Sequence, residues 1–200
     1  MAKITKIEQQ KKRHNRYSIY IDGKFALGLS EYQLVELGLK SGQELTSGEL
    51  EELEAHSTFG KAYDRCLGLL SRRPRSEKEV RDYLRRKGHE DELSDQVVAK
   101  LQGAGLLDDG KFAKEWVNWR MMVRPRSKRR LCMELRQKGI AQEQIDNALT
   151  DLSYDAELAQ LKELIEKKRT HYDSEQKLIA YLARQGYNYD MIRSGLDGED

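Results

Sequence analysis

Arginine and lysine are concentrated in two segments of this 200-residue chain. Residues 71–88 hold eight Lys/Arg against three Asp/Glu, and residues 120–138 hold eight against one. The segments carry net charges of +5 and +7 in a chain whose total is only +2, so the remaining residues sum to −10. Guanidinium groups bind phosphates and carboxylates through paired hydrogen bonds. The clustering therefore predicts a binding surface for a polyanion, either a nucleic acid or an acidic protein surface.

The candidate binding residues all lie in these two segments. One basic helix face is equally consistent with a solvated surface, but recurrence at the same place in two copies of a motif favours binding. We expect Arg81, Arg85, Arg86, Arg126, Arg129 and Arg130 to lie exposed, off the apolar stripes of their helices. The candidates are Arg72, Arg73, Arg75, Arg81, Arg85, Arg86, Lys87, Arg120, Arg124, Arg126, Lys128, Arg129, Arg130 and Arg136.

A set of residues for catalysis is missing from the sequence. It has no phosphate-binding glycine loop, no metalloprotease helix motif and no nucleophile elbow, and its four histidines are scattered. The Asp108-Asp109 pair could hold Mg²⁺, but N-capping of a helix that begins near Gly110 explains it better. We therefore expect a protein that is not an enzyme, without catalytic residues, a metal site or a cofactor.

A motif that contains the basic residues occurs three times. Residues 72–76 read Arg-Arg-Pro-Arg-Ser, and residues 124–127, in the second copy, read Arg-Pro-Arg-Ser. The third copy follows 47 residues later, but residues 172–174 read Tyr-Asp-Ser and lack Arg-Pro-Arg. Periods of this size are typical of helical arrays rather than of single globular domains.

Each copy predicts a short helix with its own start and stop signals. The serine of the motif is placed to cap the helix N-terminus, and in the first copy Glu79 completes a capping box. The two prolines of the chain end the preceding helix, and a glycine ends each new helix in a left-handed conformation. We call these the signature helices; they lie between Ser76 and Gly88, Ser127 and Gly139, and Ser174 and Gly186.

Composition predicts a mainly α fold. Hydrophobic residues make up 38% of the chain and charged residues 35%, which favours narrow apolar stripes on helices over a thick central sheet. We expect tandem three-helix repeats in an elongated array, preceded by a small N-terminal β-hairpin and helix module. No run of about 18 apolar residues occurs, and we expect a cytoplasmic protein. The expected divisions are 1–57 for the module and 58–107, 108–153 and 154–200 for the repeats.

The sequence of the N-terminal module predicts three strands and two helices. Asp22-Gly23 joins two β-rich runs and is a strong hairpin signal, and we expect all strand to lie before Ser30. Capping boxes at Ser30 and Thr46 predict one helix after each, the second ending near Glu54. We interpret the basic loop at residues 11–15 as solvated rather than as a phosphate site.

Each repeat opens with a further helix, and that of the second repeat is rich in aromatic residues. Phe112, Trp116, Trp119 and Val123 recur at helical spacing. The tryptophans could stack on nucleic-acid bases. Core packing is the better explanation at that spacing.

Two motifs carry a resemblance to a known family. Residues 71–88 read Ser-Arg-Arg-Pro-Arg-Ser-Glu-Lys-Glu-Val-Arg-Asp-Tyr-Leu-Arg-Arg-Lys-Gly, and residues 105–117 read Gly-Leu-Leu-Asp-Asp-Gly-Lys-Phe-Ala-Lys-Glu-Trp-Val. Together they resemble the RecX family of bacterial regulatory proteins, across residues 59–196 as three repeats. The N-terminal module resembles an extension that some members carry.

The resemblance implies a cytoplasmic, non-enzymatic modulator of the RecA recombinase that lies along the RecA–single-stranded-DNA filament. Such proteins suppress ATP hydrolysis, strand exchange and co-protease activity of RecA, and so act in recombination, DNA repair and the SOS response. We expect a monomer that contacts no membrane. The alternative from a different class is an autonomous DNA-binding protein with helix-turn-helix-like units, which would hold bare DNA tightly at physiological salt.

Overall fold

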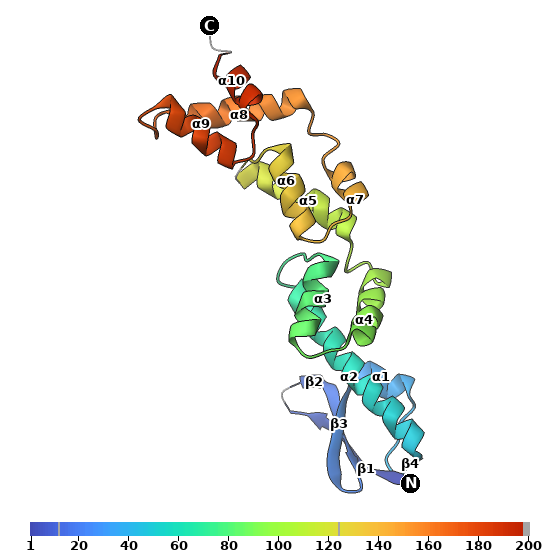
Figure 1. The fold of residues 1–200 in the computed structure, drawn as a ribbon. Coiled ribbons are helices and arrows are strands. Elements are labelled where there is room, and N and C mark those ends of the chain that lie inside the picture. The colour runs from blue at the N-terminus through green and yellow to red at the C-terminus, as the bar shows by residue number, and fades with distance from the viewer. Residues whose placement is uncertain (12, 124, 198–200) are drawn as a thin grey trace. The chain divides into compact units, whose positions relative to one another are not determined.

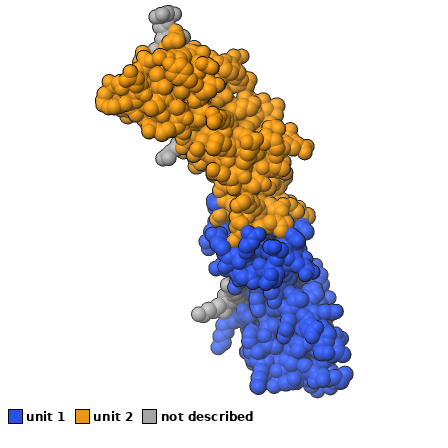
Figure 2. Space-filling view, in the orientation of Figure 1, with its two compact units in different colours: residues 1–73, 83–101 blue, residues 74–82, 102–200 orange. Residues whose placement is uncertain are grey.

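The computed structural model describes residues 1–11, 13–123 and 125–197. The chain forms two compact units: unit 1 comprises residues 1–73 and 83–101, and unit 2 comprises residues 74–82 and 102–200 (Figure 2). Helices make up more than half of the described residues (Figure 1), which confirms the mainly α prediction. Within the described part of the chain, no helix is both long and apolar enough to cross a membrane.

A small antiparallel sheet opens unit 1. Its strands are β1 (Ala2–Gln10), β2 (Arg13–Ile21), β3 (Lys24–Ser30) and β4 (Glu44–Leu45), in the order β3-β2-β1-β4. Both residues of the β2–β3 turn have positive φ, 48° at Asp22 and 79° at Gly23, as a two-residue hairpin turn of type I′ requires. The predicted hairpin is confirmed.

Two details of the predicted strands are wrong. The short strand β4 lies after Ser30 and pairs with β1. The sequence did not predict it, because two residues of edge pairing are too few to leave an alternating pattern. Strand β2 already begins at Arg13, so most of the expected loop at residues 11–15 is strand; residue 12 lies outside the described residues.

Two helices follow the sheet, and both begin with the expected capping boxes. Helix α1 (Glu31–Glu36) is capped by Ser30, and helix α2 (Ser47–Leu70) is capped by Thr46. The expected helix end near Glu54 is wrong, because residues 55–58 contain no proline or glycine and α2 continues unbroken for 24 residues. The expected division after residue 57 therefore falls inside α2.

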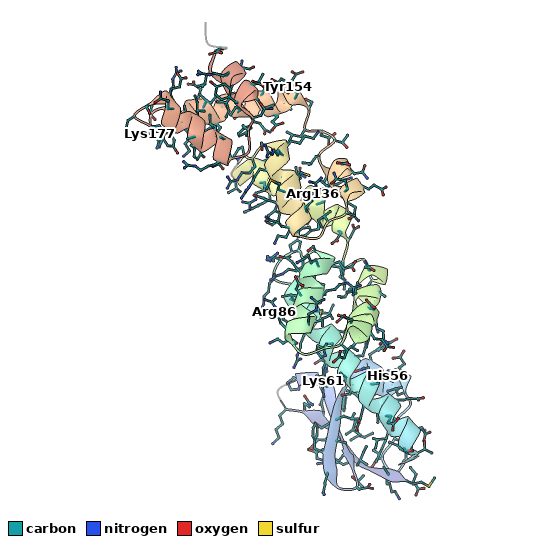
Figure 3. The ribbon with its side chains drawn as sticks, viewed as in Figure 1. His56, Lys61, Arg86, Arg136, Tyr154 and Lys177 are labelled. Carbon is teal, nitrogen blue, oxygen red and sulfur yellow. The ribbon has the colours of Figure 1, made fainter. Side chains whose placement is uncertain are left out.

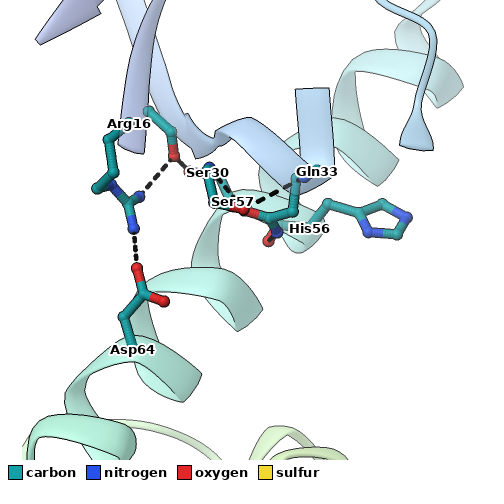
Figure 4. Close-up of polar contacts among 7 residues, drawn as sticks. Arg16, Ser30, Gln33, His56, Ser57 and Asp64 are labelled. Carbon is teal, nitrogen blue, oxygen red and sulfur yellow. Dashed lines mark hydrogen bonds and ion pairs between the residues drawn. The ribbon is translucent and has the colours of Figure 1, made fainter. Parts of the chain in front are cut away.

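Polar contacts attach α2 to the sheet (Figure 4). The guanidinium of Arg16, whose side chain is only 5% exposed, pairs with Asp64 of α2 and donates to the carbonyl of Gly28 at 2.9 Å. The hydroxyl of Ser57 donates to the same carbonyl at 2.9 Å. Hydrogen bonding of this kind satisfies polar groups that burial would otherwise leave unpaired, and it fixes the second half of α2 against the strands.

The remaining helices belong to the three repeats, and no strand occurs among the described residues of 59–196. The signature helices α3, α6 and α9 start immediately after Ser76, Ser127 and Ser174, as predicted. The helices are α3 (Glu77–Arg86), α4 (Asp91–Gly103), α5 (Asp109–Val123), α6 (Lys128–Gln137), α7 (Gln142–Ala148), α8 (Tyr154–Arg169), α9 (Glu175–Arg184) and α10 (Tyr189–Leu196).

The second and third repeats each have an apolar core of their own. The second is built around Leu131 and Leu135 of α6, both fully buried. The third is built around Leu178 and Leu182 of α9. Successive units that each have a core of their own are expected of a helical repeat protein.

Candidate functional site

The candidate residues of the first basic segment are divided between the two units. Arg75 and Arg81 belong to unit 2 and are partly buried, and the Nε atom of Arg81 lies 2.7 Å from a carboxylate oxygen of Glu77. The other candidates belong to unit 1 and are exposed; Figure 3 shows the side chain of Arg86 on α3. These exposed residues of unit 1 are Arg72, Arg73, Arg85, Arg86 and Lys87.

The second basic segment lies in unit 2 and is also only partly exposed. Lys128, Arg129 and Arg136 are exposed, and Figure 3 shows Arg136 on α6. Arg124 lies outside the described residues. The expected exposure is wrong for Arg81, Arg126 and Arg130, which are partly buried. Two further candidates, Arg75 and Arg120, are also partly buried.

Arg120 is partly buried because it neutralises a buried acid. Its Nε atom lies 2.8 Å from a carboxylate oxygen of Glu134, and the indole of Trp116 donates to the same oxygen at 3.1 Å. The guanidinium carbon also lies 4.9 Å from the ring centroid of Trp116 and 5.0 Å from that of Trp119. A buried carboxylate needs such a partner, so these contacts give Arg120 a structural role.

The expected aromatic core stripe on α5 is wrong in its second half. Phe112 is buried, and Trp116 packs partly buried against the same core. Trp119, however, is 49% exposed and Val123 is 55% exposed. The ring of Trp119 lies against Arg120 instead of entering the core.

Within unit 2, the first motif forms a joint to the next repeat. The hydroxyl of Ser76 accepts from the N–H of Glu79 at 3.3 Å, as an N-cap does, and it also donates to the carbonyl of Lys138 at 2.7 Å. The N–H of Glu77 donates to Asp109 at 2.8 Å. The ammonium of Lys138 pairs with Glu79 at 2.6 Å. We call this set joint 1.

The second motif forms a joint of the same design. The hydroxyl of Ser127 caps α6 through the N–H of Arg130 at 3.1 Å and donates to the carbonyl of Gln185 at 3.2 Å. The N–H of Lys128 donates to Glu157 at 2.9 Å. We call this set joint 2. In each joint, the start of one signature helix contacts the end of the next signature helix. An acidic side chain of the following repeat accepts a hydrogen bond from the first backbone N–H of the earlier helix.

Both joints lie directly after an Arg-Pro-Arg tripeptide. Repeats one and two carry the tripeptide, and the serine of each bonds to the repeat that follows it, whereas the third repeat lacks the tripeptide. Sequence reasoning assigned the motif to capping and to binding and missed this structural role. The signal was present, because Asp109 and Glu157 recur at nearly the same distance after each motif serine.

The Asp108-Asp109 pair has the capping role that the sequence favoured. Asp108 accepts from the N–H of Lys111 at 2.9 Å and so caps α5. Asp109 caps the signature helix of the preceding repeat through Glu77. Burial raises the pKa of the Asp109 carboxyl above its usual value, and the hydrogen bond from Glu77 opposes that rise.

Replacing a motif serine should show whether the joint bond adds to the cap. Ser174 caps α9 through Lys177 alone among the described residues, so Ser174→Ala should cost about 1 kcal/mol, the usual value of a lost cap. Ser76→Ala also leaves the Lys138 carbonyl without its donor, and should cost about 2–3 kcal/mol. Urea denaturation of both variants measures the difference. Equal free energies of unfolding would show that the joint bond contributes nothing.

Family models match four stretches of the chain. The regulatory protein RecX N-terminal domain matches residues 2–46, and the first, second and third three-helix domains of RecX match residues 62–101, 108–149 and 155–196. The regulatory protein RecX of Leuconostoc mesenteroides is 30% identical in an alignment of 203 positions, which covers 98% of this chain and 76% of the relative. The chain belongs to the RecX family.

Further RecX proteins and solved structures agree with this assignment. Regulatory protein RecX of Halalkalibacterium halodurans is 33% identical, covering 96% of this chain and 76% of that protein, and that of Bacillus subtilis is 31% identical, covering 98% and 77%. A crystal structure of regulatory protein RecX superposes with a TM-score of 0.79 at 30% identity, over 98% of this chain and all of the other. The crystal structure of RecX from Lactobacillus salivarius superposes with a TM-score of 0.60 at 26% identity, over 70% of this chain and 95% of the other.

These findings confirm two predictions made from the sequence. The resemblance to RecX, first carried by two motifs, extends over nearly the whole chain. The fold class is also confirmed, since three RecX three-helix domains follow a small N-terminal strand module.

Proposed function

We propose that this RecX-family chain is a cytoplasmic, non-enzymatic regulator that binds the RecA–single-stranded-DNA filament and inhibits ATP hydrolysis, strand exchange and co-protease activity of RecA. The observation that carries the proposal is the charge distribution: two segments of +5 and +7 in a chain whose remainder is −10. A filament presents phosphates and acidic side chains together, and a local cluster of guanidinium groups suits both.

The exposed members of the two segments are the binding residues in this proposal. In the first segment they are Arg72, Arg73, Arg85, Arg86 and Lys87, and in the second they are Lys128, Arg129 and Arg136. Arg75, Arg81, Arg120, Arg126 and Arg130 are assigned first to holding the structure, because each is partly buried. Arg129 is the simplest example of a binding residue in this assignment, since its side chain is exposed and has no hydrogen bond or ion pair among the described residues.

The organisation proposed with this function is a monomer in four parts. Residues 1–57 form the N-terminal module, and residues 58–107, 108–153 and 154–200 form the repeats, with α2 shared by the module and the first repeat. Only the first two repeats supply the basic surface. The third repeat does not bind through a motif of this kind, because it lacks Arg-Pro-Arg.

ATP hydrolysis by RecA on single-stranded DNA tests the proposal. Adding the protein should lower the hydrolysis rate in proportion to the filament occupied, and the protein alone should hydrolyse no ATP and cut no DNA, with or without Mg²⁺. An unchanged RecA rate at saturating protein would refute inhibition. Turnover by the protein alone that survives further purification would refute the assignment as a non-enzyme.

A further inference from the structure

Unit 1 contains an open cavity of about 590 Å³ beside the C-terminal end of α2. Its wall includes Asn15 of β2, Arg65 and Gly68 of α2, Arg72 just beyond that helix, and Tyr83 of α3. This volume lies within the range of sites that hold a small molecule or one residue of a polymer. The signature motif contributes only Arg72 and Tyr83, so the cavity is largely independent of the repeat pattern.

The cavity is positively charged. Its acidic lining residue, Asp64, is already paired with the buried guanidinium of Arg16. Arg65 and Arg72 are exposed, and neither side chain has a hydrogen bond or an ion pair among the described residues. The cavity is therefore lined by two guanidinium groups without a counter-charge, because its lining carboxylate, Asp64, is already paired with Arg16. Such a wall suits an anion that can accept several hydrogen bonds.

A further lining residue, Tyr83, favours a ligand with a flat ring. The ring of Tyr83 is half-buried, and the ammonium of Lys87 lies 5.8 Å from its centroid. Gly68 has helical backbone, and a Cβ atom at this position would meet nothing within 4 Å. The wall of the cavity is therefore open at this position.

We propose that this cavity binds one nucleotide of a single-stranded nucleic acid. Arg65 and Arg72 hold the phosphate, and the base lies against the ring of Tyr83. Phosphate contacts combined with an aromatic platform are the means by which proteins bind single strands without reading their sequence. An acidic peptide would use the two arginines but would leave the ring of Tyr83 without a role. The proposal rests on the proposed function, because the RecA filament supplies the strand.

Binding of a short, fluorescently labelled oligodeoxythymidine to the full chain, followed by anisotropy at low ionic strength without RecA, tests the site. Arg65→Ala with Arg72→Ala should weaken binding about tenfold. It should also lower the slope of log K against log salt by about 0.7, the contribution of one phosphate on a single strand. Tyr83→Leu should weaken binding on the order of tenfold through lost stacking, with little change in the slope.

Matched variants separate the cavity from general charge and from folding. Lys24→Ala with Lys40→Ala removes the same charge from exposed positions of unit 1 outside the cavity lining, and should change the affinity less than about twofold. Gly68→Ala should keep or raise the melting temperature and still weaken binding. Gly48→Ala, at an equally open helical position of α2 away from the cavity, should leave binding unchanged.

Several results would overturn the site. These are no binding of the oligonucleotide at low salt, an equal loss in the lysine control, unchanged affinity in Gly68→Ala, or equally effective competition by a polyglutamate peptide. The last would identify a carboxylate site. These results are distinguishable from failure of the proposed function, which is read from wild-type protein on RecA filaments, whereas the oligonucleotide assay contains no RecA.

Discussion

Gly186→Ala should destabilise the protein more than Gly88→Ala, although both glycines end a signature helix with positive φ, 98° and 78°. Alanine in a left-handed conformation costs about 1–2 kcal/mol at either position. At Gly186, the new Cβ would also lie 2.8 Å from the Cβ of Arg130 and against the Ser127 hydroxyl, inside joint 2. Overpacking of this kind adds about 1–3 kcal/mol. At Gly88 a Cβ meets nothing within 4 Å.

Urea denaturation of the two variants measures the difference in the free energy of unfolding. Gly139→Ala provides a second case, because its Cβ would lie 2.7 Å from the Cβ of Lys78 at joint 1. We expect Gly139→Ala and Gly186→Ala to resemble each other, with Gly88→Ala clearly milder. Equal losses at all three positions would contradict the assignment of Gly139 and Gly186 to the joints.

Replacing four exposed arginines, Arg85, Arg86, Arg129 and Arg136, by alanine should weaken filament binding by more than about tenfold, because each is a candidate for a charge-assisted contact. The fold should persist, since exposed substitutions usually change stability by about 0.5 kcal/mol or less and a surface ion pair such as Arg85–Asp91 contributes little. Arg126 and Arg130 are left in place, because they are partly buried and Arg130 contacts joint 2.

The control for this variant is Lys177→Ala with Arg184→Ala in the third repeat. Both residues are exposed, but their motif lacks Arg-Pro-Arg, so filament binding should change less. If phosphates are the target of the four arginines, each lost contact should also lower the logarithmic salt slope by about 0.7–0.9. If acidic side chains of RecA are the target, affinity should fall without that change. Loss of binding only in the third-repeat control would show that the charge argument is wrong.

Local signals in the sequence were sufficient for most of the helices. The motif serines and the glycines at the helix ends act on their own backbone and immediate neighbours, so the starts and stops of α3, α6 and α9 could be predicted. Strand β4 could not, because it depends on pairing with β1, about 40 residues earlier in the chain. The course of α2 past Glu54 carries only the weak local signal that residues 55–58 contain no helix breaker, and contacts such as the hydrogen bond from Ser57 to Gly28, 29 residues away, support it in the fold.

The candidate site was predicted by composition and only partly by position. Charge density identified the two basic segments, but it could not separate an arginine that faces solvent from one that neutralises a buried acid. Arg120 is an example, because Glu134, its partner, lies on another helix. Trp119 is another, since helical spacing predicted it in the core, whereas its ring is half exposed and lies against the Arg120 guanidinium.

Co-sedimentation is the most direct test of the central claim that this RecX-family chain acts on the RecA filament. Wild-type protein is mixed at physiological salt either with RecA filaments assembled on single-stranded DNA or with the same DNA alone. We predict that the protein sediments with the filaments and stays in the supernatant with bare DNA. Equal sedimentation with both would show an autonomous DNA-binding protein, and absence from the filament pellet would contradict the account.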